Sequence, residues 1–320
     1  MELMNLPPEL LLQVFGHVGA KSFRQDLGRL TVSRHWYSYA WPVLVGDIRL
    51  TATSLLQFTA DETLDLFLQR QPHIATLELN LTRNQDWTLR MLRKLGPAVE
   101  RLATVLHWCA GLRTLTVRLR RRTLGVRGKA LVVPPLADLL SFRHLTSLDF
   151  DAVGFATSHD QAHASPGPHA CALLNGLLLT SLRRLRCRLD RVCDALLVQP
   201  WDDAPTLDTL EELVVNLRLH DVATAPGRHP GYRQAPESDQ WSDSSGSCYP
   251  HQDTSTLRAI LASQASALAA RMARPRVLLL VAEIPFYGLW VFNALTGDER
   301  RRRHPGYGDV PWDDEIFAQS

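Results

Sequence analysis

LPPELLLQVFGHVGAKSFRQDLGRLTVSRHWYSYAW, residues 6–41, is the stretch on which the organisation of the chain depends. Its apolar residues recur at helical spacing in three groups, which begin near Leu11, Phe23 and Trp36. Three short helices are predicted, with Pro7 and Pro8 at the start of the first helix. A unit this small carries more large apolar side chains than its own core can enclose, so we expect one face to bind a partner.

A longer motif runs through the same residues. It comprises Leu6-Pro7-x-Glu9-Leu10-Leu11, Val14-Phe15, Asp26-Leu27-x-x-Leu30, Val32-Ser33-Arg34-x-Trp36 and Ala40-Trp41. In order and spacing it resembles the F-box, with His35 in place of a usual basic residue. The resemblance implies that residues 1–44 form a three-helix F-box domain. The alternative is an ordinary three-helix hairpin folded onto the rest of the chain.

The F-box resemblance also implies a partner. Members of this family dock a Skp-type adaptor, which joins a cullin and a RING subunit in an SCF-type ubiquitin ligase. The residues that match the motif and are expected to form or support the adaptor-binding face are Leu6, Pro7, Leu10, Leu11, Phe15, Leu27, Leu30, Val32, Ser33 and Trp36.

Composition excludes several other classes of protein. The chain has 320 residues, 45% of them hydrophobic, and a formal net charge of +2, which favours neither nucleic acid nor an anionic membrane as a partner. Its five cysteines form no Cys-x-x-Cys pair, so neither a disulfide framework nor a structural zinc is expected. We expect no signal peptide and no membrane span, and a cytoplasmic or nuclear location.

Residues 45–320 repeat a second pattern: an apolar residue, two others, an apolar residue, one other, an apolar residue. The seven segments are Val45-Ile48-Leu50, Ile74-Leu77-Leu79, Leu112-Leu115-Val117, Leu145-Leu148-Phe150, Leu182-Leu185-Cys187, Leu210-Leu213-Val215 and, more weakly, Val277-Leu280-Ala282. Alternation within each segment predicts a strand with one buried face, and helical stretches lie between the segments. We therefore expect an α/β fold in which parallel strands stack and helices cover the other side.

This pattern resembles a leucine-rich-repeat solenoid, which the F-box family often carries as its target-binding part. The family's Asn or Cys, expected three residues after each segment, is replaced at Thr53, Thr82 and four later positions. We therefore expect an irregular, leucine-rich-repeat-like solenoid. An open doubly wound α/β domain is the alternative.

Three stretches lack the repeat. Residues 157–169 and 222–255 are rich in small, polar and turn-forming residues, which predicts loops, the second of them disordered. The C-terminal part, residues 283–320, opens with an apolar cluster from Ile284 to Phe292, which predicts a cap on the last repeat.

Polar residues of stacked strands line one face of the predicted sheet, about 4.8 Å apart from strand to strand. Their charges alternate between neighbouring strands, which is typical of a self-neutralising ladder and also suits a surface that binds a target protein. The candidate target-binding residues on this face are Arg118, Asp149, Asp151, Arg186 and Arg188.

Other polar motifs are weaker. His159, Asp160, His163 and His169 lie in a predicted loop without a fixed scaffold, which favours solvated side chains over metal ligands. Arg-His-Pro-Gly-Tyr occurs at 228–232 and at 303–307, as expected of two turns or of a short docking motif.

No catalytic or phosphate-binding motif is present, so we expect no enzymatic activity, cofactor or metal. The sequence thus predicts a target-recognition subunit of an SCF-type ligase. The alternative is a leucine-rich-repeat scaffold that binds proteins without promoting ubiquitination.

Overall fold

The computed structural model describes nine parts of the chain. They are residues 6–60, 73–82, 89–118, 144–151, 181–189, 196–197, 207–218, 254–284 and 288–302. The helices in these parts are α1 (Pro8–Gln25), η2 (Leu27–Leu30, a 3-10 helix), α2 (Arg34–Gly46), α3 (Ala52–Phe58), α5 (Leu89–Leu106) and α8 (Thr254–Ala269). The strands are β1 (Asp47–Thr51), β2 (Thr76–Asn80), β3 (Thr114–Arg118), β4 (Ser147–Asp151), β5 (Arg184–Leu189), β6 (Glu212–Arg218), β7 (Val277–Ile284), β8 (Gly288–Asn293) and β9 (Asp298–Arg302).

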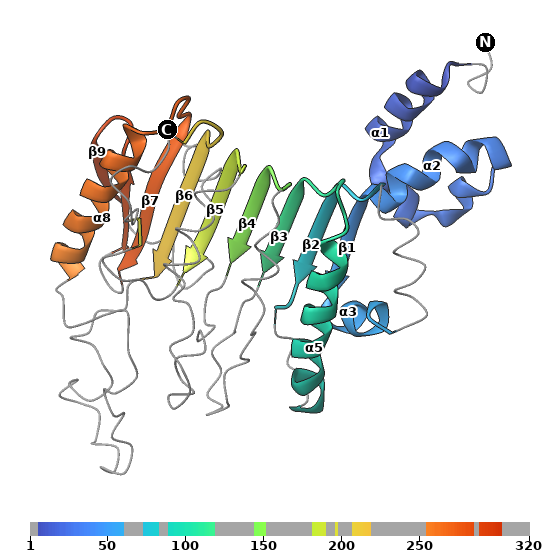
Figure 1. The fold of residues 1–320 in the computed structure, drawn as a ribbon, viewed down its shortest axis with the longest axis horizontal. Coiled ribbons are helices and arrows are strands. Elements are labelled where there is room, and N and C mark those ends of the chain that lie inside the picture. The colour runs from blue at the N-terminus through green and yellow to red at the C-terminus, as the bar shows by residue number, and fades with distance from the viewer. Residues whose placement is uncertain are drawn as a thin grey trace. The chain divides into compact units, whose positions relative to one another are not determined.

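Within each compact unit the strands follow one another in chain order, β1-β2-β3 in the first and β5-β6-β7-β8-β9 in the second, and β1 to β3 and β5 to β7 are parallel (Figure 1). The chain divides into two compact units: Met1–Arg118 with Pro135–Ser147, and Leu119–Pro134 with Leu148–Ser320. The helical segment up to α2 thus shares the first unit with β1, β2 and β3. The expected boundary between residues 44 and 45 stays a prediction.

Helix α1 begins and bends where the sequence allows it. Pro7 is the N-cap residue, and its carbonyl accepts hydrogen bonds from the backbone N–H groups of Leu10 (3.0 Å) and Leu11 (3.1 Å). At Gly19 the backbone has φ 76° and ψ 155°, a conformation open essentially to glycine alone, and the helix kinks there. The predicted second helix is therefore divided between the last turns of α1 and the 3-10 helix η2.

The helical segment has an apolar core of its own. Leu11, Phe15, Phe23, Leu30 and Ala40 are buried together in one cluster. The ring of Phe15 contacts that of Phe23 edge to face, with centroids 5.9 Å apart, and that of Trp36 at 4.5 Å. Residues from α1, η2 and α2 thus hold the three helices against one another.

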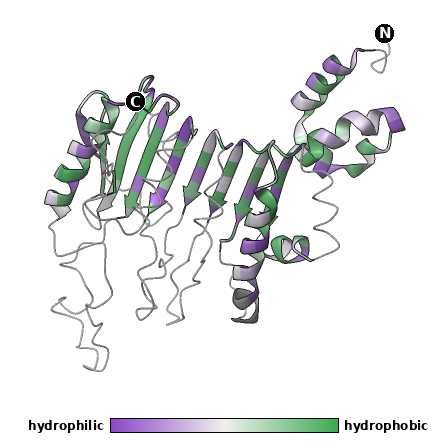
Figure 2. Cartoon of the chain, in the orientation of Figure 1, coloured by the Kyte–Doolittle hydropathy of each residue, from purple (hydrophilic) through white to green (hydrophobic). Residues whose placement is uncertain are grey.

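Parallel strands place like residues side by side in the first unit. Leu77 pairs with Leu115 and Leu79 with Val117, and all four side chains are fully buried. The residues between them alternate to the other face and are partly exposed. Figure 2 shows that hydrophobic and hydrophilic residues alternate along these strands. The strands predicted from the recurring apolar segments are confirmed as β1 to β7.

Main-chain hydrogen bonds join neighbouring strands where they begin. The carbonyl of Ala75 accepts from the N–H groups of Arg113 (2.8 Å) and Thr114 (3.0 Å). In the second unit, the carbonyl of Arg183 accepts in the same way from Glu211 (2.8 Å) and Glu212 (2.9 Å). These paired bonds join neighbouring strands although the Asn or Cys expected after each segment is absent.

The second unit ends in an antiparallel meander. Strands β5, β6 and β7 are parallel, and β8 and β9 continue the sheet antiparallel to β7 and to each other. Helix α8 connects β6 to β7, and the guanidinium of Arg258 in this helix lies 5.7 Å from the ring centroid of Trp290 in β8. Of the apolar residues expected to cap the last repeat, Ile284 ends β7, whereas Leu289, Trp290, Val291 and Phe292 lie in β8, which pairs with β7.

Strand order decides against one alternative. A doubly wound domain reverses its strand order at a switch point. In both units the order follows the chain, β1-β2-β3 and β5-β6-β7, so the doubly wound alternative is wrong.

The kink at Gly19 generates a stability prediction. Gly19→Ala forces a side chain into a backbone conformation that costs about 1–3 kcal/mol, and should lower the free energy of unfolding by that amount. Gly16 is its matched control, because it is helical and nothing lies within 4 Å of an added Cβ. Gly16→Ala should be neutral or stabilise by up to about 1 kcal/mol. Urea titration measures both, and equal effects would contradict the kink.

Candidate protein-binding site

Three of the residues that match the motif are exposed apolar side chains. Leu10 is 43% exposed, Leu27 60% and Val32 66%. Leu10 lies on α1 and Leu27 on η2, two elements whose neighbouring residues Leu11 and Leu30 meet in the same core cluster. We call these three residues the exposed apolar set. A large exposed apolar residue is ordinary when single, whereas several on one small unit mark a surface that a partner can cover.

The other residues of the motif form the core and the helix caps that hold the exposed apolar set in place. Leu11, Phe15 and Leu30 are buried in the helical core, and Leu6 and Trp36 are partly buried against it. Pro7 caps α1, and the hydroxyl oxygen of Ser33 caps α2 by accepting a hydrogen bond from the N–H of Trp36 (3.0 Å). The exposed positions Leu12, Val18 and Tyr37 were not among the predicted residues.

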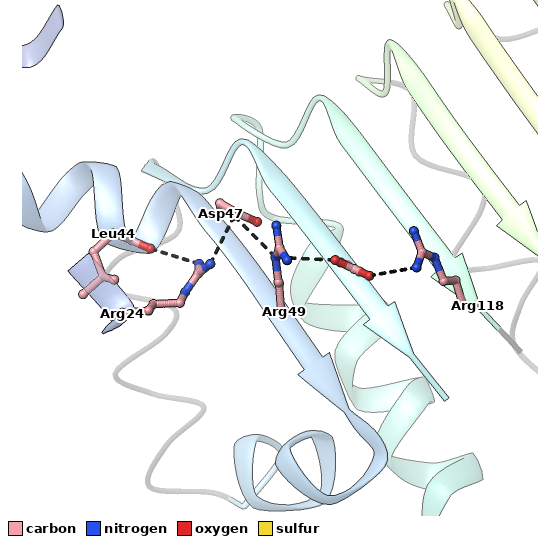
Figure 3. Close-up of polar contacts among 6 residues, drawn as sticks. Arg24, Leu44, Asp47, Arg49 and Arg118 are labelled. Carbon is pink, nitrogen blue, oxygen red and sulfur yellow. Dashed lines mark hydrogen bonds and ion pairs between the residues drawn. The ribbon is translucent and has the colours of Figure 1, made fainter. Parts of the chain in front are cut away.

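Charged side chains of alternating sign cross the strands of the first unit (Figure 3). Arg24 of α1 pairs with Asp47 of β1 at 3.1 Å, and Arg49 lies 3.6 Å from the same carboxylate. Arg49 also lies 3.5 Å from Glu78 of β2, which is 3.6 Å from Arg118 of β3. Each distance joins a guanidinium nitrogen to a carboxylate oxygen. We call these five residues the charge ladder.

The charge ladder includes residues that sequence reasoning missed. Arg118 was predicted, whereas Asp47, Arg49 and Arg24 were not. Asp47 and Arg49 flank Ile48 in the first apolar segment, so extending the strand comparison by one segment would have found them. Arg24 offers no such signal, because a tertiary contact brings α1 to β1.

In the second unit a similar face carries the other predicted residues. Arg184 lies 4.0 Å from Asp149 and 3.5 Å from Glu212, and Arg186 lies 3.8 Å from Glu212. These pairs are partly exposed, and exposed ion pairs contribute only about 0–1 kcal/mol each. Such a face presents both positive and negative side chains, and these contribute little to the stability of the sheet.

Asp151 and Arg188 differ from their neighbours by their burial. Their side chains are 0% and 6% exposed, and Nη1 of Arg188 donates to Oδ2 of Asp151 at 3.3 Å. Asn216, in register with Arg188 on the next strand, is also buried. Within the described parts of the chain, this pair is enclosed by the protein, while Arg118, Asp149 and Arg186 are the more accessible of the predicted residues.

Several sequence-based hypotheses fall outside the described residues. They concern the histidines between 159 and 169, the loops at 157–169 and 222–253, and both Arg-His-Pro-Gly-Tyr segments; residues 254–255 belong to α8. Within the described ranges, no group of three or more His, Cys, Asp or Glu residues could hold a metal ion. No described helix is both long and apolar enough to cross a membrane.

Comparison with known proteins adds no assignment. No family model matches the chain, and neither the curated proteins nor the solved structures contain a significant match.

The buried ion pair predicts an asymmetric mutational effect. Asp151→Ala removes the carboxylate that the buried Arg188 contacts, so the free energy of unfolding should fall by about 3–5 kcal/mol. Glu78→Ala, in the more exposed charge ladder, should cost no more than about 1 kcal/mol. Urea titration of both variants checks the difference. Similar losses from the two would contradict a structural role for the buried pair.

Burial also predicts how the ionisation of the Cys109 thiol affects stability. Desolvation raises the pKa of this thiol from 9.0 to about 11, and its Sγ–H donates to the carbonyl of Val105 at 3.6 Å. The unfolded chain releases this proton at lower pH, so the contribution of Cys109 to stability should fall as pH rises from 9 to 11. Cys109→Ala should flatten the pH dependence of the unfolding free energy in this window. An unchanged slope would contradict the raised pKa.

Proposed function

We propose that this chain is the substrate-recognition subunit of an SCF-type cullin–RING E3 ubiquitin ligase. The helical segment at residues 6–44 binds a Skp-type adaptor, and the strand face of the following α/β part binds a target protein. The chain itself performs no chemistry in this proposal. It holds the target near the ubiquitin-loaded enzyme, which raises the effective concentration of the reacting groups.

One observation carries the proposal. The motif residues of the helical segment divide into a closed core and an exposed apolar set, Leu10, Leu27 and Val32. A segment with its own core does not need these three side chains for folding. Their exposure therefore supports a docking role, and the order and spacing of the motif name the kind of partner.

The strand face suits the second half of the proposal. Arg49 of β1 is in register with Glu78 of β2, and Arg118 lies two positions beyond the register partner of Glu78 on β3, so these partly exposed charges alternate in sign from strand to strand. We propose that stacked strand–helix units form a leucine-rich-repeat-like solenoid and that this face contacts the target. Mixed charges favour specificity, because a partner with the wrong pattern meets like charges.

Substitution of the exposed leucines tests adaptor binding. Leu10→Arg with Leu27→Arg places two charges on the proposed interface and leaves the core cluster intact. The affinity for a Skp-type adaptor should fall at least thirtyfold, about 2 kcal/mol, as expected for central interface residues. Surface plasmon resonance with the full chain measures this.

The matched control is Leu295→Arg, an equally drastic change at an exposed leucine of the second unit. It should leave adaptor affinity within about twofold of the parent. Circular dichroism checks that all variants stay folded. Binding that survives the double substitution in a folded protein, or no binding by the parent, would contradict the proposal.

A further inference from the structure

Strand β9 is the last strand of the sheet. Among the described residues it pairs with one strand only, β8, from Asn293↔Asp298 to Leu289↔Arg302. Its residues Asp298, Glu299, Arg300 and Arg301 are all exposed. A strand in this position presents unpaired N–H and C=O groups on its outer edge, which can hydrogen-bond to another strand.

The edge is preformed by a tight hairpin. Gly297 has φ 76°, and its N–H donates to the carbonyl of Asn293 at 2.8 Å. Oγ1 of Thr296 donates to the carboxylate of Asp298 at 2.9 Å, and Oδ1 of Asn293 accepts from the N–H of Leu295 at 3.0 Å. These bonds fix the start of β9, so a partner strand would meet an ordered template.

The order of charges along β9 identifies the partner. The strand reads Asp-Glu-Arg-Arg-Arg, with both acids at its start and the bases at its end. A uniformly acidic or basic peptide would meet like charges at one end. An antiparallel copy of the same strand meets opposite charges at both ends, so we propose that β9 pairs with β9 of a second copy of this chain and forms a twofold symmetric dimer.

Symmetry fixes the register. A twofold axis perpendicular to the sheet leaves each side chain on the same face of the sheet in both copies. Residues opposite each other in antiparallel strands also point to the same face. One residue must therefore lie on the axis, opposite its own copy. With Arg300 on the axis, Glu299 lies opposite Arg301 of the second copy and Asp298 opposite Arg302. Every register sets the central charge opposite its own copy, so the registers differ in the pairs beside the axis. Centring on Glu299 keeps only Asp298 opposite Arg300, and centring on Arg301 sets Arg300 opposite Arg302, so Arg300 is the centre with the most opposite-charge pairs.

The Glu299–Arg301 pair is the testable element. Both residues are exposed and share one face, since they lie opposite Phe292 and Trp290 of β8. Glu299→Arg alone, or Arg301→Glu alone, turns two symmetry-related attractive pairs into repulsive ones. The dimer dissociation constant should rise about tenfold for either variant, because each cross-strand charge pair contributes a modest amount.

Combining the changes restores complementarity. The double variant Glu299→Arg with Arg301→Glu recreates opposite charges across the axis, and its dissociation constant should return to within about threefold of the parent. The two single variants mixed in equal amounts should also associate, because each supplies the charge that the other lacks. Analytical ultracentrifugation of the full chain at low salt measures all five samples. NaCl at 0.5 M should weaken the dimers of the parent, the double variant and the mixture, whose Glu299–Arg301 positions carry opposite charges, because salt screens the attraction.

Arg274→Glu is the control, since it makes the same charge change at an exposed arginine outside β9 and should leave the dimer unchanged. A parent chain that stays monomeric at 100 µM would overturn the proposal, including the case in which another segment or protein occupies the edge. Single variants that dimerise like the parent, or a mixture that fails to associate, would do the same. None of these outcomes depends on adaptor binding.

Discussion

The structure depends on the burial of apolar side chains that neighbouring parallel strands present in register. Leu77, Leu79, Leu115 and Val117 are fully buried on one face of the sheet, yet no strand could bury its own residues alone. Each strand supplies part of the cover for the next. Backbone hydrogen bonds to the carbonyls of Ala75 and Arg183 then join neighbouring strands where they begin. The opposite face is left free for polar residues, and that face carries the charge ladder.

The helical segment also buries its apolar side chains, in a smaller core of its own. Phe15 contacts rings from both sides, Phe23 in α1 and Trp36 in α2, so the core closes with few residues. The core closes at Phe15 without Leu10, Leu27 and Val32, which lie outside the buried cluster and are exposed. The pair Arg24–Asp47 adds a polar link from α1 to the first strand. This arrangement is the basis of our proposal that the helices bind an adaptor and the strands a target.

Local periodicity accounts for most of what the sequence predicted. An apolar residue at every second position predicts a strand wherever it occurs, which is why β1 to β7 could be placed. The same rule cannot say that Asp151 and Arg188 are buried, since burial of polar strand residues depends on tertiary structure. Arg24–Asp47 was missed for a similar reason. The β8–β9 hairpin could have been predicted from the sequence. Thr296, Gly297 and Asp298 are turn-forming residues, and they lie where β8 ends and β9 begins.

The central claim is that the helical segment is the adaptor-binding site. Hydrogen–deuterium exchange of the full chain, with and without a Skp-type adaptor, tests this claim most directly because it locates the interface without any substitution. The account predicts slower exchange in peptides covering residues 8–36 and unchanged exchange in β2 and β3. Slower exchange confined to the strands, or no change anywhere at saturating adaptor, would contradict it.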